Sequence, residues 1–387
     1  MSVTQIRSRP DGRVDETSDE PQNPLARLTE EQIESLAQEF DAIHDQVYAD
    51  LGDSDARYIR GTIKLHRELV IAARAMLLGS RRKPLWLAGT AALSVAKILE
   101  NMEIGHNVMH GQWDWMNDPD INSQSWDWDN ASPADAWRHS HNYVHHTFTN
   151  IRGKDRDLGY EIMRVDHRQK WHPVYLLQPL YNLLLMGFFE WGVAVHDLDR
   201  EAIVSGEKSK EQLRSELKAI GVKARRQVVK DYIAFPLLSR GSFKSTLAAN
   251  FTANIVRNIW AHSIIFCGHF PDQTYTFSQS EVEGESRGGW YVRQLIGSAN
   301  IDGSPLFHLL AGNLSFQVEH HLYPDMPSSR YAEIAPRVRD VCRRYGLPYN
   351  TGPLHRQLGA VHRTILRLAF PGGHPRPKPG PYRPERV

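Results

Sequence analysis

The sequence predicts a mainly α-helical integral membrane protein, with about four transmembrane helices in two hairpins and a cytosolic, histidine-rich helical cap. Three observations lead to this prediction. Long apolar stretches alternate with long polar ones, histidines gather in three clusters just outside the apolar stretches, and the chain contains ten tryptophans. Tryptophan collects at membrane interfaces because its ring has one apolar and one polar side.

The N-terminal part predicts disorder followed by two helices. Residues 1–28 are polar and contain three prolines, so we expect them to be disordered. Thr29 and Gln32 form a capping-box pattern, which opens an amphipathic helix that we expect to end near Leu51. A second helical pattern begins near Ala56 and becomes apolar farther along.

Four apolar stretches are candidates for membrane spans: 69–79, 85–100, 174–195 and 246–268. The third covers 22 residues, long enough to cross the roughly 30 Å hydrocarbon core of a bilayer. The others are weaker by hydropathy, and the fourth contains several polar or charged side chains. The alternative is a soluble helical protein with buried helices, and the length of the third stretch argues against it.

Two hairpins that enter a bilayer from one side would bring the three histidine clusters together, because the clusters lie in the polar segments 106–172 and 269–387. The charges near the turns leave the orientation rule ambiguous. We expect residues 29–370 to form one domain and the Pro-rich, basic tail 371–387 to be disordered.

Composition limits the partners and cofactors of this chain of 387 residues. The 46 Lys and Arg balance the 45 Asp and Glu, so nothing in the charge indicates a nucleic-acid partner. Cys267 and Cys342, the two cysteines, can form neither a four-cysteine iron–sulfur site nor a disulfide framework. No apolar segment follows Met1, so no secretory signal is visible. No Gly-x-Gly-x-x-Gly opens a strand–helix unit, so we expect NADPH not to bind this chain.

The densest histidine cluster lies in the stretch 137–150, WRHSHNYVHHTFTN. His141 and His145 are four residues apart, so on a helix they lie on one face. His146 is turned by about 100° from His145 on an α-helix, so the adjacent pair can serve two different metal ions. The other clusters are GHNVMHG, with His106 and His110, and FQVEHHLYP, with His320 and His321.

A single pair of histidines is more often structural than metal-binding, and one cluster alone is also compatible with a zinc site. Neutral imidazole suits iron, zinc, copper and nickel. Three clusters together, with few carboxylates, indicate two metal ions that keep open positions for oxygen or water. The remaining histidines, which we interpret as ordinary, are His44, His66, His167, His172, His196, His308, His355, His362 and His374.

The motifs HNVMH, HNYVHH and QVEHH resemble, in order and spacing, the three histidine boxes of the membrane fatty acid desaturases. The resemblance covers about residues 29–365. It includes NMEIGHNVMHGQWDWMND, a DRDLGY that follows VHHTFTN, FCGHFPD and EHHLYPDMPSSRY. It is strongest to the bacterial, NADPH-dependent branch that acts on stearoyl-CoA at carbon 9.

The resemblance implies a set of eight iron ligands. They are His106, His110, His141, His145, His146, His269, His320 and His321. Gln317 stands where many family members have a histidine, so we place it in a second tier of metal or supporting residues. His262, in an Asn258-x-x-x-His262 pattern, is a rival to His269. His139 is expected to be a supporting donor or a surface histidine.

The resemblance also implies the reaction. Two iron ions would use O₂ and two electrons to introduce a cis double bond into a saturated acyl chain, with carbon 9 of stearoyl-CoA as the expected position. The electrons would come from NADPH through a separate iron–sulfur reductase. The other expected partners are acyl-CoA and membrane lipid, and the expected location is the bacterial plasma membrane with the active site on the cytoplasmic side.

Several alternatives stay open. The same histidine boxes occur in hydroxylases, which insert oxygen rather than form an alkene, and in desaturases that act on acyl-lipids at other positions. A third alternative is a haem or metal carrier without enzymatic activity. Arg152, Lys154 and Arg156 are candidates for contacts to a CoA phosphate, although a solvated loop explains them equally well.

Overall fold

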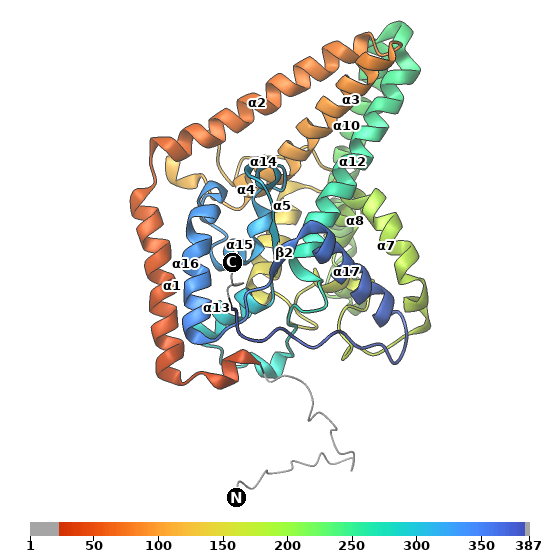
Figure 1. The fold of residues 1–387 in the computed structure, drawn as a ribbon. Coiled ribbons are helices and arrows are strands. Elements are labelled where there is room, and N and C mark those ends of the chain that lie inside the picture. The colour runs from red at the N-terminus through yellow and green to blue at the C-terminus, as the bar shows by residue number, and fades with distance from the viewer. Residues whose placement is uncertain (1–22, 384–387) are drawn as a thin grey trace, which may run out of the picture.

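The computed structural model describes residues 23–383, which form a mainly helical body with one small sheet (Figure 1). Residues 1–22 and 384–387 lie outside the described residues, and most of the N-terminal segment that we expected to be disordered is among them. The longer helices are α1 (Glu30–Asp50), α2 (Asp53–Leu78), α3 (Lys83–Ile98), α7 (Gln178–Gly187), α10 (Lys210–Val228), α12 (Phe243–His269), α13 (Arg287–Ile296), α16 (Tyr331–Tyr345) and α17 (Leu354–Leu368). The shorter ones are α4 (Asn107–Met109), α5 (Ala134–Trp137), α6 (His146–Phe148), α8 (Phe189–His196), α9 (Arg200–Ser205), α11 (Phe235–Leu238), α14 (Pro305–Leu310) and α15 (Gln317–Leu322).

The first predicted helix is confirmed, cap included. The Thr29 hydroxyl accepts a hydrogen bond from the Gln32 amide, and the Gln32 side chain accepts one from the Thr29 amide. Helix α1 packs against α13 and α16 (Figure 1). Its apolar positions, spaced three and four residues apart, are buried in the largest core cluster. They are Leu36, Phe40, Ile43 and Val47.

Helices α2 and α3 form a hairpin against which α12 packs, and these helices, together with α10 and α11, form a part that projects beyond the rest of the body (Figure 1). The prediction that four helices cross a membrane is wrong. Within residues 23–383, no helix combines the length and the apolar character that a membrane span requires. The predicted integral membrane localisation is not supported, for the same reason.

Two features explain why the apolar stretches misled the prediction. The stretch 174–195 is not one helix but a 3₁₀ turn (Pro173–Leu177) followed by α7 and α8, because the backbone leaves helical geometry at Phe188. In contrast, α12 is continuous over 27 residues but buries several polar side chains along its length. They are Asn250, Asn254, Arg257, Asn258 and His262.

Two helices change their winding where the histidine clusters lie. Helix α3 runs on through a π-helical stretch, Leu99–His106, into α4, and α5 runs through another, Arg138–His145, into α6. A π-helical turn is wider than an α-helical turn and is found frequently at functional sites. The first two histidine clusters therefore lie on locally widened helices rather than on regular α-helices.

The sheet consists of two short parallel strands, β1 (Asn300–Asp302) and β2 (Thr351–Pro353), with Asn300 paired to Thr351. Its contribution is to hold the third histidine cluster in place. The Asn300 side chain accepts a hydrogen bond from the Val318 amide and donates one to the Glu319 carboxylate, both on α15. Strand β1 is thereby tied to the helix that carries His320 and His321.

The part of the predicted disordered tail that the structure describes, residues 371–383, follows a non-helical path along the body. Arg376 forms an ion pair with the buried carboxylate of Asp272. Farther on, the Tyr382 amide donates a hydrogen bond to the Leu347 carbonyl oxygen.

Candidate metal centre

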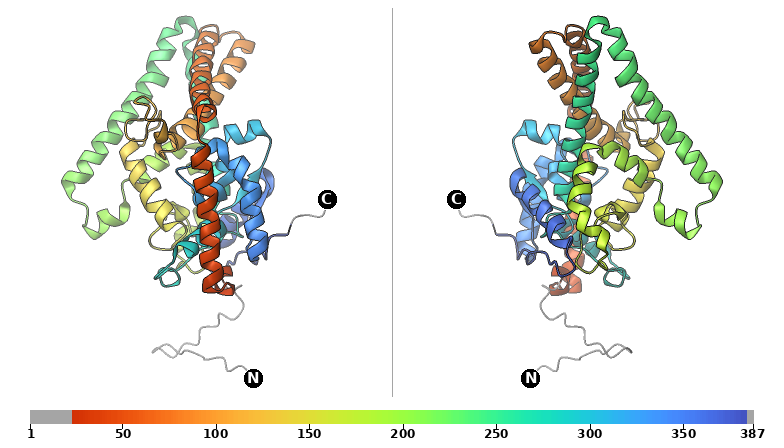
Figure 2. Two further views of the ribbon diagram at one scale, coloured as in Figure 1. Left: turned by 90° about the vertical axis from the view of Figure 1, so that its left-hand side faces the viewer. Right: turned by 90° about the vertical axis from the view of Figure 1, so that its right-hand side faces the viewer.

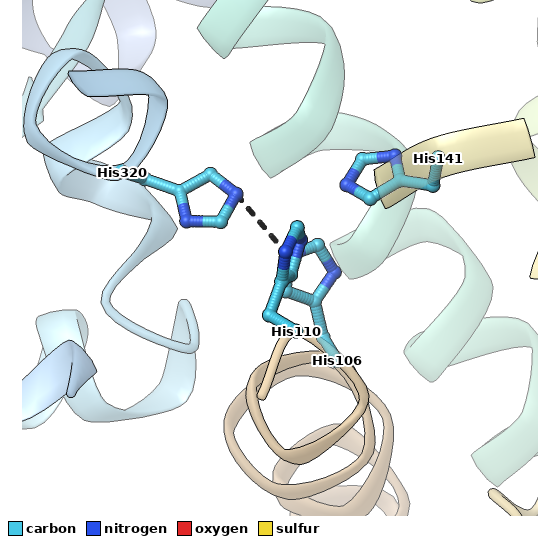
Figure 3. A group of neighbouring side chains, drawn as sticks. All are labelled: His106, His110, His141 and His320. Carbon is cyan, nitrogen blue, oxygen red and sulfur yellow. Dashed lines mark hydrogen bonds between the residues drawn. The ribbon is translucent and has the colours of Figure 1, made fainter. Parts of the chain in front are cut away.

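Four histidines from three parts of the chain converge in a first histidine group, namely His106, His110, His141 and His320 (Figure 3). One ring nitrogen from each lies within 4.8 Å of the others. His106 and His110 come from the end of the α3–α4 helix, His141 from the second π-helical stretch and His320 from α15. The wide sequence separation shows that only the folded chain assembles this group.

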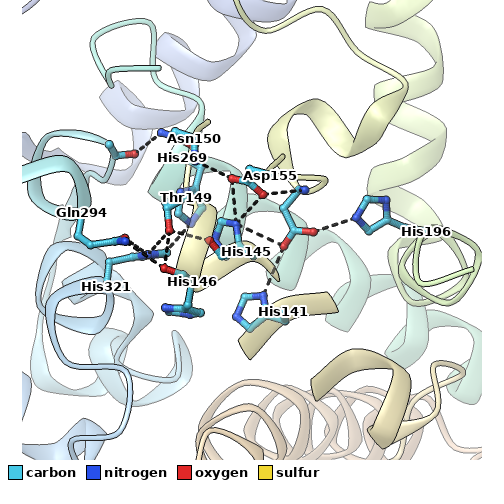
Figure 4. Close-up of polar contacts among 12 residues, drawn as sticks. His141, His145, His146, Thr149, Asn150, Asp155, His196, His269, Gln294 and His321 are labelled. Carbon is cyan, nitrogen blue, oxygen red and sulfur yellow. Dashed lines mark hydrogen bonds and ion pairs between the residues drawn. The ribbon is translucent and has the colours of Figure 1, made fainter. Parts of the chain in front are cut away.

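A second histidine group lies beside the first and consists of His145, His269 and His321 (Figure 4). Their ring nitrogens also approach within 4.8 Å of one another. The amide nitrogen of Gln317 is 3.0 Å from Nε2 of His269. Gly268 makes this approach feasible, because a Cβ at that position would lie 2.7 Å from Cγ of Gln317.

His146 lies between the two groups. Its ring stacks on that of His321 at 4.4 Å between centroids and meets the rings of His110 and His320 edge-on at 4.7 and 4.8 Å. Both ring nitrogens of His146 are buried and have no hydrogen-bond partner. All eight histidines that the sequence analysis expected to bind metal therefore meet in one continuous cluster.

In four of these histidines, Nδ1 is held by a neighbouring side chain. Two partners are carboxylates, at 3.0 Å and 3.4 Å, one is a tyrosine hydroxyl at 3.2 Å and one is an amide oxygen at 3.0 Å. The pairs are His141 with Asp157, His145 with Asp155, His320 with Tyr331 and His321 with Gln294. A partner at Nδ1 fixes the tautomer and ring orientation and leaves Nε2 free to bind a metal.

The donor set fits metal ions on two counts. Nε2 of His110 and of His141, like both nitrogens of His146, is buried without a hydrogen-bond partner, which is costly unless another group binds there. In addition, Nε2 of His269 and Nε2 of His321 lie 3.1 Å apart, and the corresponding atoms of His106 and His320 lie 3.5 Å apart. Two imidazole nitrogens bound at about 2.1 Å to one metal stand about 3.0 to 3.4 Å apart.

The protonation of the cluster also favours metal binding. Burial, together with the charges of neighbouring histidines, lowers the pKa of six of them well below the usual value of 6.5. They are His106, His110, His146, His269, His320 and His321. Only neutral imidazole binds a metal, so these side chains are ready ligands at neutral pH.

His145 differs from the other members of the cluster. Burial lowers its pKa, but the charges of Asp155 and Asp157 outweigh burial and raise the pKa to about 9. Asp157 lies near both groups, with Oδ2 at 3.4 Å from Nδ1 of His141 and 3.7 Å from Nδ1 of His145. One carboxylate therefore supports a histidine in each group.

Three second-tier residues lie apart from both groups. His262, the rival to His269, contacts Asn182 at 3.1 Å and stacks on Phe266. Asn258 donates a hydrogen bond to the Gly187 carbonyl oxygen, although it also lines the cavity described below. His139 is exposed and stacks on Tyr143.

The sequence analysis gave no role to the residues that support the cluster. Asp155 and Asp157 lie in the DRDLGY motif that the family resemblance included, so the motif was a usable signal. His196, which we interpreted as ordinary, holds Asp157 with Nε2 at 2.8 Å from Oδ1 (Figure 4). No sequence pattern marks His196, because α8 brings it to the cluster from 39 residues beyond Asp157.

A small enclosed cavity of about 50 Å³ borders the cluster. His106, His141 and His269 form one side of it. The remainder of the wall combines apolar and aromatic side chains with about as many polar ones, three carboxylates included. Among these lining residues are Trp128, Asn130, Trp137, Tyr160, Phe189 and Glu190. The arrangement can hold metal ions next to a narrow space.

Comparisons with known proteins agree with this geometry. The family model described as fatty acid desaturase matches residues 84–353. An NADPH-dependent stearoyl-CoA 9-desaturase of Mycobacterium tuberculosis is 48% identical over 351 residues, which cover 90% of this chain and 82% of the relative. An sn-1 linoleoyl-lipid 6-desaturase of Synechocystis is 26% identical over 280 residues, covering 70% of this chain and 76% of that protein. This chain belongs to the fatty acid desaturase family.

Proposed function

We propose that this oxidoreductase is an acyl-CoA desaturase with two iron ions, which introduces a double bond at carbon 9 of a stearoyl chain. The observation that carries the proposal is the pair of adjacent histidine groups, in which neighbouring side chains hold Nδ1 of four histidines and leave Nε2 of each to bind a metal. The first group would hold one iron and the second group the other, with His146 between them.

Iron fits the proposed reaction better than zinc does, because desaturation is an oxidation. Zinc has no redox chemistry, whereas imidazole-bound iron activates O₂. When bound, the two ions would supply the oxidant that removes two hydrogens from neighbouring methylene groups.

The chain itself supplies position and exclusion of water. Asp155 and Asp157 hold the rings of His145 and His141 in a fixed orientation. The cavity beside the cluster is where the reacting part of an acyl chain would lie, because its apolar and aromatic side chains, such as Trp128, Trp137 and Phe189, would contact the methylene groups. Gln317 would complete the surroundings of the second iron, either with its own oxygen or through a water molecule.

Electrons would come from NADPH through a separate iron–sulfur reductase. Cys267 and Cys342 are both buried and free, and burial raises the pKa of each thiol, so neither offers a thiolate for a metal cluster. The name of the mycobacterial relative includes NADPH, which supports the same source of electrons.

The substrate proposal follows the relative with 48% identity, whose name specifies stearoyl-CoA and position 9. The Synechocystis relative acts, by its name, on a lipid-bound chain at position 6. Its identity is lower, at 26%, and it covers less of this chain. An acyl-CoA substrate is therefore better supported than a lipid-bound acyl chain.

The test combines a metal count with product analysis. The protein is supplied with a compatible reductase, NADPH, O₂ and labelled stearoyl-CoA, and the acids are identified by mass spectrometry after derivatisation of any double bond. We expect about two irons per chain and a monounsaturated acid with its double bond at carbon 9. A hydroxy acid would move the protein to the hydroxylases, and a haem absorption band would refute the proposal.

A further inference from the structure

A second cavity, of about 370 Å³, lies between α2, α3, α10 and the loop 126–130, and we call it the basic cavity. Helix α10 slants away from the body and forms its outer wall (Figure 2). Ligand pockets in proteins usually enclose about 300 to 1,000 Å³, so this cavity is large enough for a small molecule. Six cationic side chains line it: Arg67, Arg74, Lys97, Lys223, Arg226 and Lys230.

The basic cavity has an excess of positive charge. Its six Lys and Arg face three carboxylates, those of Glu100, Asp127 and Asp129. A larger cavity of about 600 Å³ near the C-terminal tail has no such excess, because its three Lys and Arg meet three carboxylates. A surface concavity with surplus cations raises the local concentration of anions.

The six cations differ in how firmly they are held. Lys97 is buried and donates to Asp231 at 2.8 Å, and Lys230 is paired with Asp129. Arg226, in contrast, is 72% exposed and reaches Asp127 only at 3.7 Å. The inner cations are fixed by protein carboxylates, and those at the outer edge can turn toward a ligand.

The basic cavity adjoins the enclosed cavity at the metal centre. Trp128 and Asn130 line both of them. The indole of Trp128 donates a hydrogen bond to the Ser132 carbonyl oxygen at 2.8 Å, and its side chain packs against Gly105, where a Cβ would lie 3.0 Å from that of Trp128. Two side chains therefore separate a cation-lined space from the space beside His106.

We propose that the basic cavity binds the phosphate-bearing head group of the acyl thioester, with the acyl chain passing Trp128 and Asn130 to reach the metal centre. The inference rests on the proposed function. It assigns each end of an amphipathic substrate to a space of matching chemistry: the anionic nucleotide to the surplus cations, and the methylene chain to the aromatic wall.

The loop with Lys154 and Arg156 fits a phosphate group less well. The cavity beside it is lined by these two cations and five carboxylates, and Arg156 is already within 3.4 Å of Asp199. Arg152 likewise forms an ion pair with Asp166 at 3.3 Å. An anion there would meet net negative charge.

The test removes two cations from the outer edge and keeps the metal centre intact. The double variant Arg67→Ala/Arg226→Ala is compared with Arg214→Ala/Lys218→Ala, which removes two cations from a part of α10 that does not line the cavity. We expect the first variant to raise KM for stearoyl-CoA at least about tenfold with little change in kcat, because it loses charge-assisted hydrogen bonds to phosphate. The control variant should match the wild type.

A substrate without phosphate sharpens the result. Stearoyl N-acetylcysteamine thioester keeps the acyl chain and thioester but lacks the nucleotide. The double variant and the wild type should have the same KM for it. An unchanged KM for stearoyl-CoA, or an equal rise for both substrates, would overturn the inference.

Direct binding of free CoA separates this inference from the proposed function. Calorimetry on the iron-loaded protein should show CoA binding that weakens at least about tenfold in the double variant. Inorganic phosphate at the same concentration should not displace it; equal displacement would mean that any anion suffices and would refute a head-group site. If CoA binds through these arginines but no alkene forms, the proposed function fails and the head-group site stands.

Discussion

The two histidine groups use the same ligand type but are assembled differently. In the first group, His106 and His110 come from one turn of one helix, so half of the group is fixed locally. In the second, His145, His269 and His321 come from three separate elements. The second group therefore depends more on tertiary structure than the first does.

The supports of the two groups also differ. A carboxylate, Asp155, holds His145 of the second group at 3.0 Å, and the carboxylate nearest the first group, Asp157, approaches His141 at 3.4 Å. The second group has three histidines and the amide of Gln317 where the first has four histidines. The group with fewer imidazoles therefore has the closer carboxylate support, and variants of each group can test this difference.

The largest effect should come from removing a ligand of the second group. In His145→Ala we expect about one iron per chain to remain, in the first group. Activity should fall by more than the roughly 100-fold that loss of a supporting residue costs. Metal analysis and product formation measure both, and His167→Ala, which alters a histidine outside both groups, is the control. Loss of both irons would show that the two groups form one unit.

The next effect comes from the supports. Asp155→Asn should weaken iron binding in the second group by roughly 10- to 100-fold, because the amide no longer holds the proton on Nδ1 of His145 as a carboxylate does. Tyr331→Phe removes the hydroxyl near His320 and should weaken the first group less, since a neutral partner is lost. Competition with a chelator measures both. A larger loss of iron affinity in Tyr331→Phe than in Asp155→Asn would contradict the expected difference between the two groups.

A pH-dependent effect should be specific to the helix of the first group. Glu103 is buried and accepts hydrogen bonds from Tyr58, Ser328 and Asn313. Burial raises its pKa from 4.5 to about 7. Between these values the folded state binds more protons than the unfolded state, so stability is present below pH 4.5 and is lost as the pH rises to about 7.

Glu103→Gln should remove this loss. Relative to the wild type, the variant should gain up to a few kcal/mol in unfolding free energy between pH 4.5 and 7. Denaturant unfolding at several pH values measures the difference, and the exposed Glu34→Gln is the control. A pH-independent difference between variant and wild type would contradict the assignment.

The smallest effect concerns the amide of the second group. Gly268→Ala would place a Cβ 2.7 Å from Cγ of Gln317, so this flexible side chain must shift, at a cost of about 1 kcal/mol. Iron binding in the second group should weaken slightly, and the first group should be unaffected. Gly221→Ala in α10 has open space around the new Cβ and should instead stabilise the protein by about 0.5–1 kcal/mol. Thermal unfolding and metal analysis compare the two.

Much of the site could be predicted from the sequence. Three histidine motifs in the order found in the desaturase family predict a metal centre. The structure brings all eight expected histidines together. The capped helix α1 was also predictable, because both its cap and its apolar spacing are local. Local signals of this kind need no knowledge of what packs against them.

Other features depended on tertiary contacts. Apolar composition alone does not show where a helix breaks, and the predicted span 174–195 failed because the backbone leaves helical geometry at Phe188. The supporting residue His196 also escaped prediction, because nothing near it in the sequence links it to Asp157.

The sequence by itself determined the three histidine motifs, the pairing of histidines along short helices and the family. Only the tertiary structure decided which histidines share a group, that His269 rather than His262 joins the cluster, and where a cation-lined cavity meets the metal centre. The physical reason is range: spacing along one helix is set by backbone geometry, whereas contacts between distant elements depend on how all of their buried faces pack together.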